Sequence, residues 1–398
     1  MKKKYLIIVL IGFIILTIAR SIDFSSTPPA GPEAHSSGSR LFQLLSGDRV
    51  DGYSQAIEAR TFRFPEDHGP HPDFRNEWWY LTGNLDDERG ERFGFELTFF
   101  RFALIPGRLK SGSHWQSNQV YLAHFAVTDA AKEQFYVAQR FSRGALELAG
   151  AQTMPFKVWI DDWSIKEKQV PGQGILNKGR AVSGNEHWEL TASTHGLSLQ
   201  LNLIADKPPV LNGKGGLSQK SAVPGNASYY YSISRLRSEG SLQIGRQAHT
   251  VSGVSWLDRE WSSSALAADQ QGWDWFALQL SDGSDLMFYN IRKNDGSQDE
   301  YSAGTWISKE GEALHLSRRD LTLAVTGEWE STDGVAYPAR WDISIPELDL
   351  LLTVIPLIDD QELFTTVRYW EGAVDVTGYK NHVAIEGRGY VELTGYVQ

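Results

Sequence analysis

The 398-residue sequence contains no cysteine. It therefore cannot form disulfides or carry a lipid on an N-terminal cysteine. After the first four residues, lysine and arginine are thinly spread, and 49 acidic side chains outnumber 38 basic ones to give a formal charge of −11. Proteins that bind nucleic acids use clustered lysine and arginine to displace counterions from phosphates, so no nucleic-acid partner is expected.

Familiar catalytic signatures are missing as well. The sequence has no G-x-S-x-G nucleophile elbow, no H-E-x-x-H motif, no Walker loop and no G-x-G-x-x-G fingerprint. A serine hydrolase or a dinucleotide-dependent enzyme is therefore not expected, and no cofactor is predicted.

The N-terminus has the pattern of an export segment. Three lysines at positions 2–4 precede an uncharged apolar run, residues 5–19, which Arg20 ends. Residues 1–22 are predicted to be a signal peptide or a membrane anchor, with residues 5–19 as the membrane tether and residues 23–52 as a flexible linker. The expected location is the cell envelope, on the extracytoplasmic (periplasmic) side.

The rest of the chain is predicted to be all-β. Its apolar segments are short and alternating, turns interrupt them about every ten residues, and aromatic residues are abundant. The predicted strands include residues 78–85, 93–101, 120–128, 134–140, 187–193, 197–205, 228–236 and 249–258. The glycine- and proline-rich segment 207–226 is predicted to be a long loop, either a lid or disordered.

An internal repeat divides this β region into two units. Residues 77–85 align with residues 272–280, and each segment precedes a turn and a second aromatic strand that ends in arginine. We expect two antiparallel β-barrels in tandem, residues 53–264 and 265–398, with open sandwiches as the alternative. The second unit has fewer histidine and tryptophan clusters and is expected to be mainly a packing partner.

A histidine- and proline-containing loop lies before the first repeat strand. His68 and His71 are three residues apart, and Glu77, Trp78 and Tyr80 follow on the strand. The loop puts titratable groups beside an apolar surface, as a ligand site requires. A zinc site would need further ligands from other strands, and a rigid hydrogen-bonded loop is the other interpretation.

A second candidate site lies on residues 254–262. On a strand, Trp256, Asp258 and Glu260 share one face, while Arg259 lies on the other. A carboxyl group beside tryptophan has a raised pKa and can act as a general acid. Alternatively, Asp258 or Glu260 pairs with Arg259 or another cation and seals a barrel end.

Three consecutive tyrosines form the third candidate site. In residues 229–231, the side chains of Tyr229 and Tyr231 must face the same way, so that their hydroxyl groups could orient a ligand at a barrel mouth. Half-buried packing residues are the alternative.

These motifs resemble the AttH-type, lipocalin-like proteins related to carotenoid 1,2-hydratase. The resemblance covers the chain from about residue 53 and rests on residues 64–72, 77–80, 216–220, 228–232, 256–261 and 387–396. It implies two calycin-like barrels, export, and association with the membrane components of an ABC-type export system. In the related hydratases an acid protonates an isoprenoid double bond and water adds to the cation, which makes Asp258 the implied acid and Trp256 the ring that faces the cation. The hydratases have a histidine-rich version of this motif, and here Arg259 would hold Asp258 ionised.

Two main functional hypotheses result. The first is an exported protein that binds a hydrophobic small molecule, a lipid or isoprenoid, without chemistry of its own. The second is an acid-catalysed hydratase (a hydro-lyase) or hydrolase that acts on an apolar substrate without a metal. An accessory subunit of a transporter is a third possibility. The predicted catalytic residues are Asp258, Trp256, His68 and His71, and the predicted ligand-binding residues are Glu77, Trp78, Tyr80, Tyr229, Tyr231 and Glu260. The enzyme hypothesis expects Asp258 and the histidine loop near one pocket.

Overall fold

The computed structural model describes residues 51–107, 115–168, 186–264 and 266–397. The predicted export segment and nearly all of the predicted linker lie outside the described residues. Within the described part of the chain, we find no helix with the length and apolar character needed to cross a membrane.

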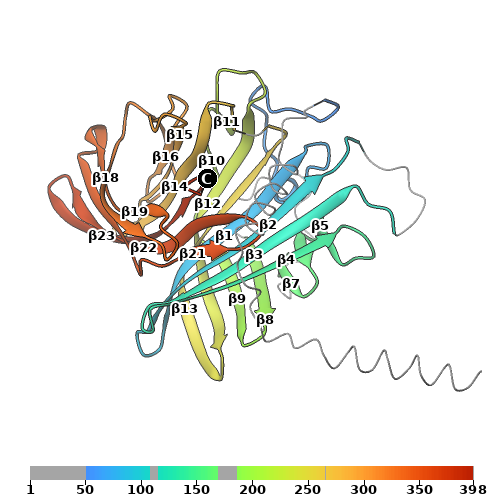
Figure 1. The fold of residues 1–398 in the computed structure, drawn as a ribbon, viewed down its shortest axis with the longest axis horizontal. Helices are drawn as coiled ribbons and strands as arrows, with labels where there is room; N and C mark the ends of the chain where they lie inside the picture. The colour runs from blue at the N-terminus through green and yellow to red at the C-terminus, as the bar shows by residue number, and fades with distance from the viewer. Residues whose placement is uncertain (1–50, 108–114, 169–185, 265, 398) are drawn as a thin grey trace, which may run out of the picture.

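Two curled antiparallel sheets lie side by side and make up nearly all of the described chain, which confirms the all-β prediction (Figure 1). The spatial order of the first sheet is β4-β3-β2-β1-β13-β12-β9-β8-β7-β6-β5, with β10 and β11 paired to β12. Its strands are β1 (Asn76–Asp87), β2 (Arg92–Ala103), β3 (Gln119–Asp129), β4 (Gln134–Arg143), β5 (Ala149–Gln152), β6 (Lys157–Ile160), β7 (Trp163–Glu167), β8 (His187–Thr194), β9 (Leu197–Ala205), β10 (Val210–Leu211), β11 (Leu217–Gln219), β12 (Ala227–Ile244) and β13 (Gln247–Ser262). The predicted loop 207–226 thus contains two short strands.

The first sheet closes on itself as a barrel. Its two end regions meet where Arg140 on β4 donates to the carbonyl oxygen of Ile160 on β6 over 3.2 Å. A short 3-10 helix, η1 (Glu66–His68), precedes β1 within the histidine loop.

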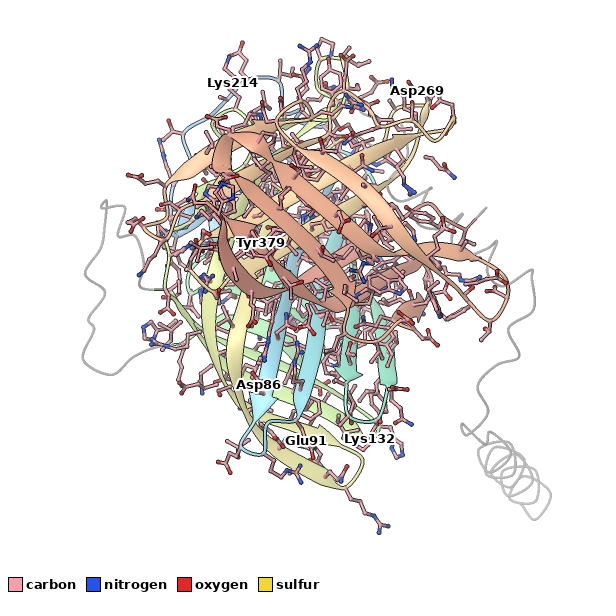
Figure 2. All side chains as sticks on the ribbon, turned by 90° about the vertical axis from the view of Figure 1, so that its left-hand side faces the viewer. Asp86, Glu91, Lys132, Lys214, Asp269 and Tyr379 are labelled. Atoms are coloured by element: carbon pink, nitrogen blue, oxygen red, sulfur yellow. The ribbon has the colours of Figure 1, made fainter. Side chains whose placement is uncertain are left out.

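The second sheet is a half-barrel. Its order is β17-β16-β15-β14-β23-β22-β20-β19-β18, with β21 paired to β22. Its elements are β14 (Gln270–Leu280), β15 (Asp285–Lys293), β16 (Ala303–Ile307), β17 (Ala313–Ser317), β18 (Thr322–Glu330), β19 (Ala336–Ile345), η2 (Pro346–Leu348), β20 (Leu350–Pro356), β21 (Glu362–Phe364), β22 (Arg368–Lys380) and β23 (Val383–Leu393). Figure 2 looks onto this sheet, and the strands of the first sheet extend below it towards Asp86, Glu91 and Lys132.

The internal repeat corresponds to equivalent strands of the two sheets. In the first sheet, β1 lies between β2 and the last strand β13; in the second, β14 lies between β15 and the last strand β23. The aligned residues Tyr80 and Trp275 therefore occupy the same position in each sheet. Asp258 lies opposite Tyr80, and Glu392 lies opposite Trp275.

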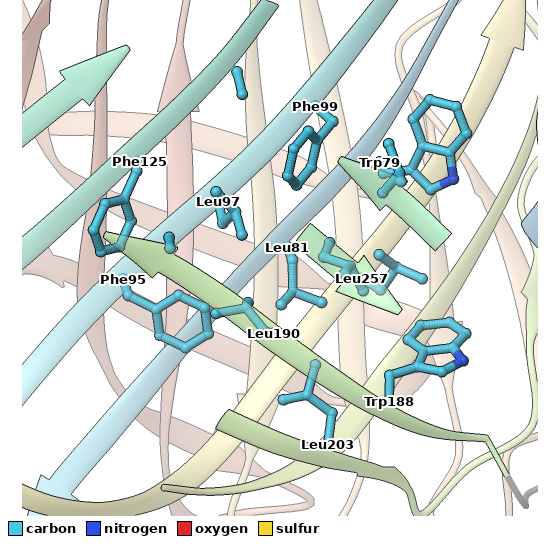
Figure 3. Packing of buried hydrophobic residues seen from close by; sticks show 14 of the residues in the cluster. Trp79, Leu81, Phe95, Leu97, Phe99, Phe125, Trp188, Leu190, Leu203 and Leu257 are labelled. Carbon is cyan, nitrogen blue, oxygen red and sulfur yellow. The ribbon is translucent and has the colours of Figure 1, made fainter. Parts of the chain in front are cut away.

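Side chains fill the interior of the first barrel. One buried cluster includes Trp79, Leu81, Phe95, Phe125 and Trp188, all at most 2% exposed, and Figure 3 shows how these rings and aliphatic groups interdigitate. An interior packed in this way is a core, in which each side chain contributes to stability. This interior is therefore the hydrophobic core of the first unit.

A separate cluster joins the two sheets. It combines residues on the outward face of the first sheet, such as Tyr80, Tyr230 and Trp256, with residues of the second, such as Trp275 and Tyr289. We call this region the inter-sheet layer. Ion pairs from one sheet to the other lie around it, including Lys207–Asp285 at 2.7 Å, Arg235–Asp285 at 2.8 Å, Arg92–Asp375 at 2.6 Å and Arg388–Asp86 at 2.5 Å.

Candidate functional site in the inter-sheet layer

The two faces of β13 belong to two different environments. Trp256 and Asp258 face the inter-sheet layer, whereas Leu257 and Trp261 belong to the core of the first barrel. This alternation is the one predicted from the sequence, and it follows from the period of two along a strand. It also divides the predicted site residues into two groups that lie on opposite sides of the same sheet.

Asp258 accepts hydrogen bonds from three fixed donors. The indole N–H of Trp256 donates to Oδ1 over 2.7 Å, the hydroxyl of Ser232 also donates to Oδ1, and the phenol of Tyr230 donates to Oδ2. Among the described residues, no ion pair joins Asp258 to a cation. The Asp258 side chain is thus oriented by neutral groups alone.

Burial raises the pKa of Asp258 to about 7. The three hydrogen bonds lower this pKa because they stabilise the ionised carboxylate. The nearby negative charge of Glu260 raises it. Asp258 can therefore both hold and release a proton near neutral pH, as a general acid must.

The expectation that Arg259 ionises Asp258 is wrong. Arg259 lies on the other face of β13, where its Nη2 is 2.7 Å from Glu77 Oε2 and its guanidinium lies 3.9 Å from the ring centroid of Trp79. Neighbours in sequence on a strand point to opposite faces, and for that reason this cation lies in the core and Asp258 does not.

Aromatic rings from both sheets surround Asp258. Trp275 donates its indole N–H to the Tyr230 oxygen over 3.0 Å, and its ring meets that of Tyr80 edge-on, with centroids 4.9 Å apart. Trp78, half-buried, packs on the same cluster. Such ring faces can bind an apolar ligand and stabilise a positive charge that forms on it.

Glu392 is a second carboxyl group of this layer, and it is not among the site residues predicted from the sequence. It occupies the position in the second sheet that Asp258 occupies in the first. Burial and the negative charges of Glu96, Glu260 and Asp258 raise its pKa to about 8. The repeat alignment could have indicated Glu392 if it had been extended from the first strand of each unit to the last.

Glu260 lies on the same face but is ion-paired. Its Oε1 is 3.4 Å from Lys220 Nζ, which also lies 3.9 Å from the ring centroid of Tyr289 in the second sheet. Lys220 comes from the predicted lid loop. The loop therefore contributes a cation to one side of the layer.

The histidine loop lies on the barrel side, away from Asp258. The Glu77 carboxylate pairs with Arg101 and Arg259, and the backbone N–H of His71 donates to both of its oxygens over 3.1 Å. The His71 ring stacks on Trp261 at a centroid distance of 3.7 Å. Burial would raise the pKa of Glu77, but the two guanidinium groups outweigh it and hold this pKa well below its usual range.

His68 and two of the tyrosines belong to the same barrel end. His68 Nδ1 is 2.7 Å from the hydroxyl of Tyr231, and its Nε2 is 3.7 Å from Glu186. Tyr229 and Tyr231 pack in the barrel core, and the intervening Tyr230 is the tyrosine that reaches Asp258. The structure therefore does not bring His68, His71, Glu77, Tyr229 and Tyr231 together with Asp258, contrary to the single-pocket expectation.

Two other places in the described residues have features of a site. Asp87, Glu91 and His249 offer metal-ligand atoms within 4.8 Å of one another, but the Arg89 guanidinium bonds to all three and already supplies a positive charge. A hollow of about 480 Å³ on the second sheet has a charged and polar lining and includes no residue of the inter-sheet layer: its lining residues are Lys293, Gln298, Glu300, Ser317, Arg318 and Arg319. We therefore centre the candidate site on Asp258.

Comparison with known proteins agrees with this architecture. Residues 55–396 match the model of the AttH-like family. The chain belongs to the AttH-like family. The crystal structure of an AttH protein from Nitrosomonas europaea is 32% identical, with a TM-score of 0.74, and the match covers 86% of this chain and all of that one. Kievitone hydratase from Nectria haematococca shares the fold at 14% identity, with a TM-score of 0.64 over 86% of this chain and 96% of its own. No curated protein matches the chain in sequence.

Proposed function

We propose that the inter-sheet layer binds an apolar small molecule, a lipid or isoprenoid, and that Asp258 protonates a carbon–carbon double bond of it. The observation that carries this proposal is the environment of Asp258: a buried carboxyl group, unpaired with any cation among the described residues, between aromatic rings of two sheets.

The chemistry is acid-catalysed hydration. The Asp258 carboxyl group transfers its proton to one alkene carbon, and the π electrons form the new C–H bond and leave a tertiary cation on the other carbon. Aromatic faces such as those of Trp256 and Trp275 stabilise this cation. Water then bonds to the cation and returns a proton to the Asp258 carboxylate, so that the net reaction adds one water molecule.

The shared fold supports this choice. Kievitone hydratase has the same fold, and its name describes a hydratase. The pairing of the carboxyl groups supports the location. Glu77 in the barrel interior is paired with two arginines, whereas Asp258 in the layer has, among the described residues, only neutral hydrogen-bond donors.

The test uses the full chain and a branched polyene, β-farnesene, in water enriched in oxygen-18. We expect a tertiary alcohol that carries the label, and we expect Asp258→Asn to reduce its formation by at least about 100-fold. Asp342→Asn makes the same change at an exposed carboxylate and should leave the rate unchanged. If the polyene binds but is recovered unchanged from both wild type and Asp258→Asn, the catalytic part of the proposal is wrong and a carrier function remains.

Export is proposed from the N-terminal sequence alone. We propose that residues 1–22 direct the protein to the periplasm, where it acts with an ABC-type export system. Fractionation of cells that express the full chain, and of cells that express a variant without residues 5–19, tests the location. Recovery of the full chain in the cytoplasm would contradict it.

A further inference from the structure

A second group of buried polar side chains lies in the inter-sheet layer. We call it the Glu96–Glu371 cluster, and its members are Tyr80, Glu96 and Thr98 of the first sheet and Glu371 and Tyr390 of the second. Glu96 is 0% and Glu371 is 1% exposed. Burial raises the pKa of both carboxyl groups, that of Glu96 to about 7, and the negative charge of Glu96 raises that of Glu371 further.

The polar atoms of this cluster have no hydrogen-bond partner at normal geometry. This holds for both carboxylate oxygens of Glu96 and of Glu371, for Thr98 Oγ1, and for the hydroxyls of Tyr80 and Tyr390. Native proteins pair nearly all buried polar atoms with protein, water or ligand, because an unpaired group costs free energy. The groups also face one another, since Thr98 and Tyr369 lie beside the Glu96 carboxyl group, Tyr80 and Tyr369 lie beside that of Glu371, and Thr128 lies beside Tyr390. Because none of the seven atoms has a hydrogen bond of normal geometry, the cluster keeps hydrogen-bonding capacity that a polar group of another molecule can use.

Strand register places this cluster next to Asp258. On β1, Tyr80 lies opposite both Asp258 and Thr98, and on β22 Glu371 lies opposite Glu392. Strand β2, which carries Glu96, is two strands from β13, or roughly 10 Å in a sheet. A molecule bound at Asp258 can thus reach the cluster along the same face.

Charge restricts what this second position can bind. Lys220 already pairs with Glu260, and the inter-sheet cations described above pair with Asp285, Asp375 and Asp86. An anionic group beside Glu96 and Glu371 would meet negative or neutral carboxyl groups and would find no free cation there among the described residues. A protonated carboxyl group, in contrast, both donates and accepts hydrogen bonds, as do the nearby hydroxyls.

We propose that the Glu96–Glu371 cluster binds an uncharged hydroxyl or carbonyl group at one end of the ligand, so that the protein selects neutral, oxygen-bearing apolar molecules over anionic lipids. This inference rests on the proposed function, since it describes the other end of a molecule that Asp258 protonates. It adds the chemical class of that ligand.

The test measures the binding of three probes with one carbon skeleton to the full chain at pH 7: farnesol, farnesoic acid and farnesene. Quenching of tryptophan fluorescence reports binding, because Trp256 and Trp275 lie in the layer. We expect farnesol to bind wild type about tenfold more tightly than farnesene, and farnesoic acid to bind most weakly. In Glu96→Leu, farnesol should lose this tenfold advantage while farnesene binds as before.

The controls separate this inference from the proposed function. Glu96→Gln keeps the volume and hydrogen-bonding capacity of the neutral acid, so it should retain most of the preference for farnesol even if Glu96→Leu folds poorly. Equal binding of farnesol and farnesene to wild type, or equal weakening of both by Glu96→Leu, would overturn the cluster's role alone. Tighter binding of farnesoic acid than of farnesol would do the same. Failure of wild type to bind any of the three probes would overturn both proposals.

Discussion

Trp275, on the second sheet, donates its indole N–H to the phenol oxygen of Tyr230, on the first sheet, over 3.0 Å. An indole N–H can only donate, so the Tyr230 oxygen accepts from it and the Tyr230 hydroxyl proton is directed to Asp258. The second sheet therefore controls the hydrogen bonding of the carboxyl group in the first. It is more than the packing partner that the sequence suggested.

Trp275→Phe tests this control. Without the indole donor the Tyr230 hydroxyl becomes a weaker donor to Asp258, so the ionised form of Asp258 is less stabilised and its pKa should rise. We expect the midpoint of the pH–rate profile to move upward by about half a unit and turnover to fall about tenfold. Trp341→Phe makes the same truncation in the core of the second sheet and should leave the midpoint in place. An unchanged midpoint in Trp275→Phe would contradict the argument.

The wild-type pH–rate profile should follow Asp258. A general acid is active only when protonated, and the pKa of Asp258 is about 7. Turnover should therefore be constant at low pH and fall about tenfold per pH unit above that value. A rate that increases with pH through this range would exclude Asp258 as the acid.

Arg259→Lys separates the two faces of β13. The substitution keeps the charge but loses part of a fork that bonds Glu77 and the carbonyl oxygen of Gly69. We expect lower stability in urea unfolding, by about 2 kcal/mol, and an unchanged pH–rate midpoint. A midpoint that moves by a full unit would mean that Arg259 acts on Asp258 after all.

Glu77→Gln should be costly for folding. It removes the negative partner of two buried guanidinium groups, which leaves their charges uncompensated, and such losses amount to about 3–5 kcal/mol. Urea unfolding measures the effect. If the folded variant binds farnesene as wild type does, Glu77 has a structural role. If it loses binding while its free energy of unfolding is unchanged, Glu77 has the ligand-binding role predicted from the sequence.

Asp258→Asn should change how stability depends on pH. The folded pKa of Asp258, about 7, is above its ordinary value of 3.8, so the folded protein retains a proton that the unfolded chain releases. The contribution of Asp258 to stability therefore decreases as pH rises from about 4 to 7. The asparagine side chain of the variant does not titrate, so the variant's free energy of unfolding does not decrease for this reason. Relative to wild type, it should increase by roughly 3 kcal/mol between about pH 4 and pH 7 in urea unfolding. Parallel curves for the two proteins would contradict the raised pKa.

The period of two along strands explains how much the sequence could predict. It placed Trp256, Asp258 and Glu260 on one face of β13 and Arg259 on the other, and the structure agrees. It could not say which face points to a core and which to a second sheet, because both faces are apolar and aromatic. For the same reason the sequence favours Tyr229 and Tyr231, which share a face, over Tyr230.

The missing residues depend on contacts between units. Glu96, Glu371 and Glu392 lie on strands whose sequences give no sign that they face one another, since the docking of the two sheets is determined by long-range packing. His68 and His71 lie on the other face, away from Asp258. Titratable residues in a conspicuous motif suggested chemistry, and the structure places them in hydrogen bonds and ion pairs that close a barrel end.

The alternation along β13 determines which substitutions affect the barrel core and which affect the inter-sheet layer. Residues that pack the core of the first barrel alternate along this strand with residues that face Asp258 and the second sheet. Substitutions on the outward face can therefore alter what is bound or transformed without changing a side chain of the barrel core, but they do change the packing between the two sheets. A library restricted to outward-facing positions of β1, β2 and β13 would vary ligand preference and the docking of the second sheet together.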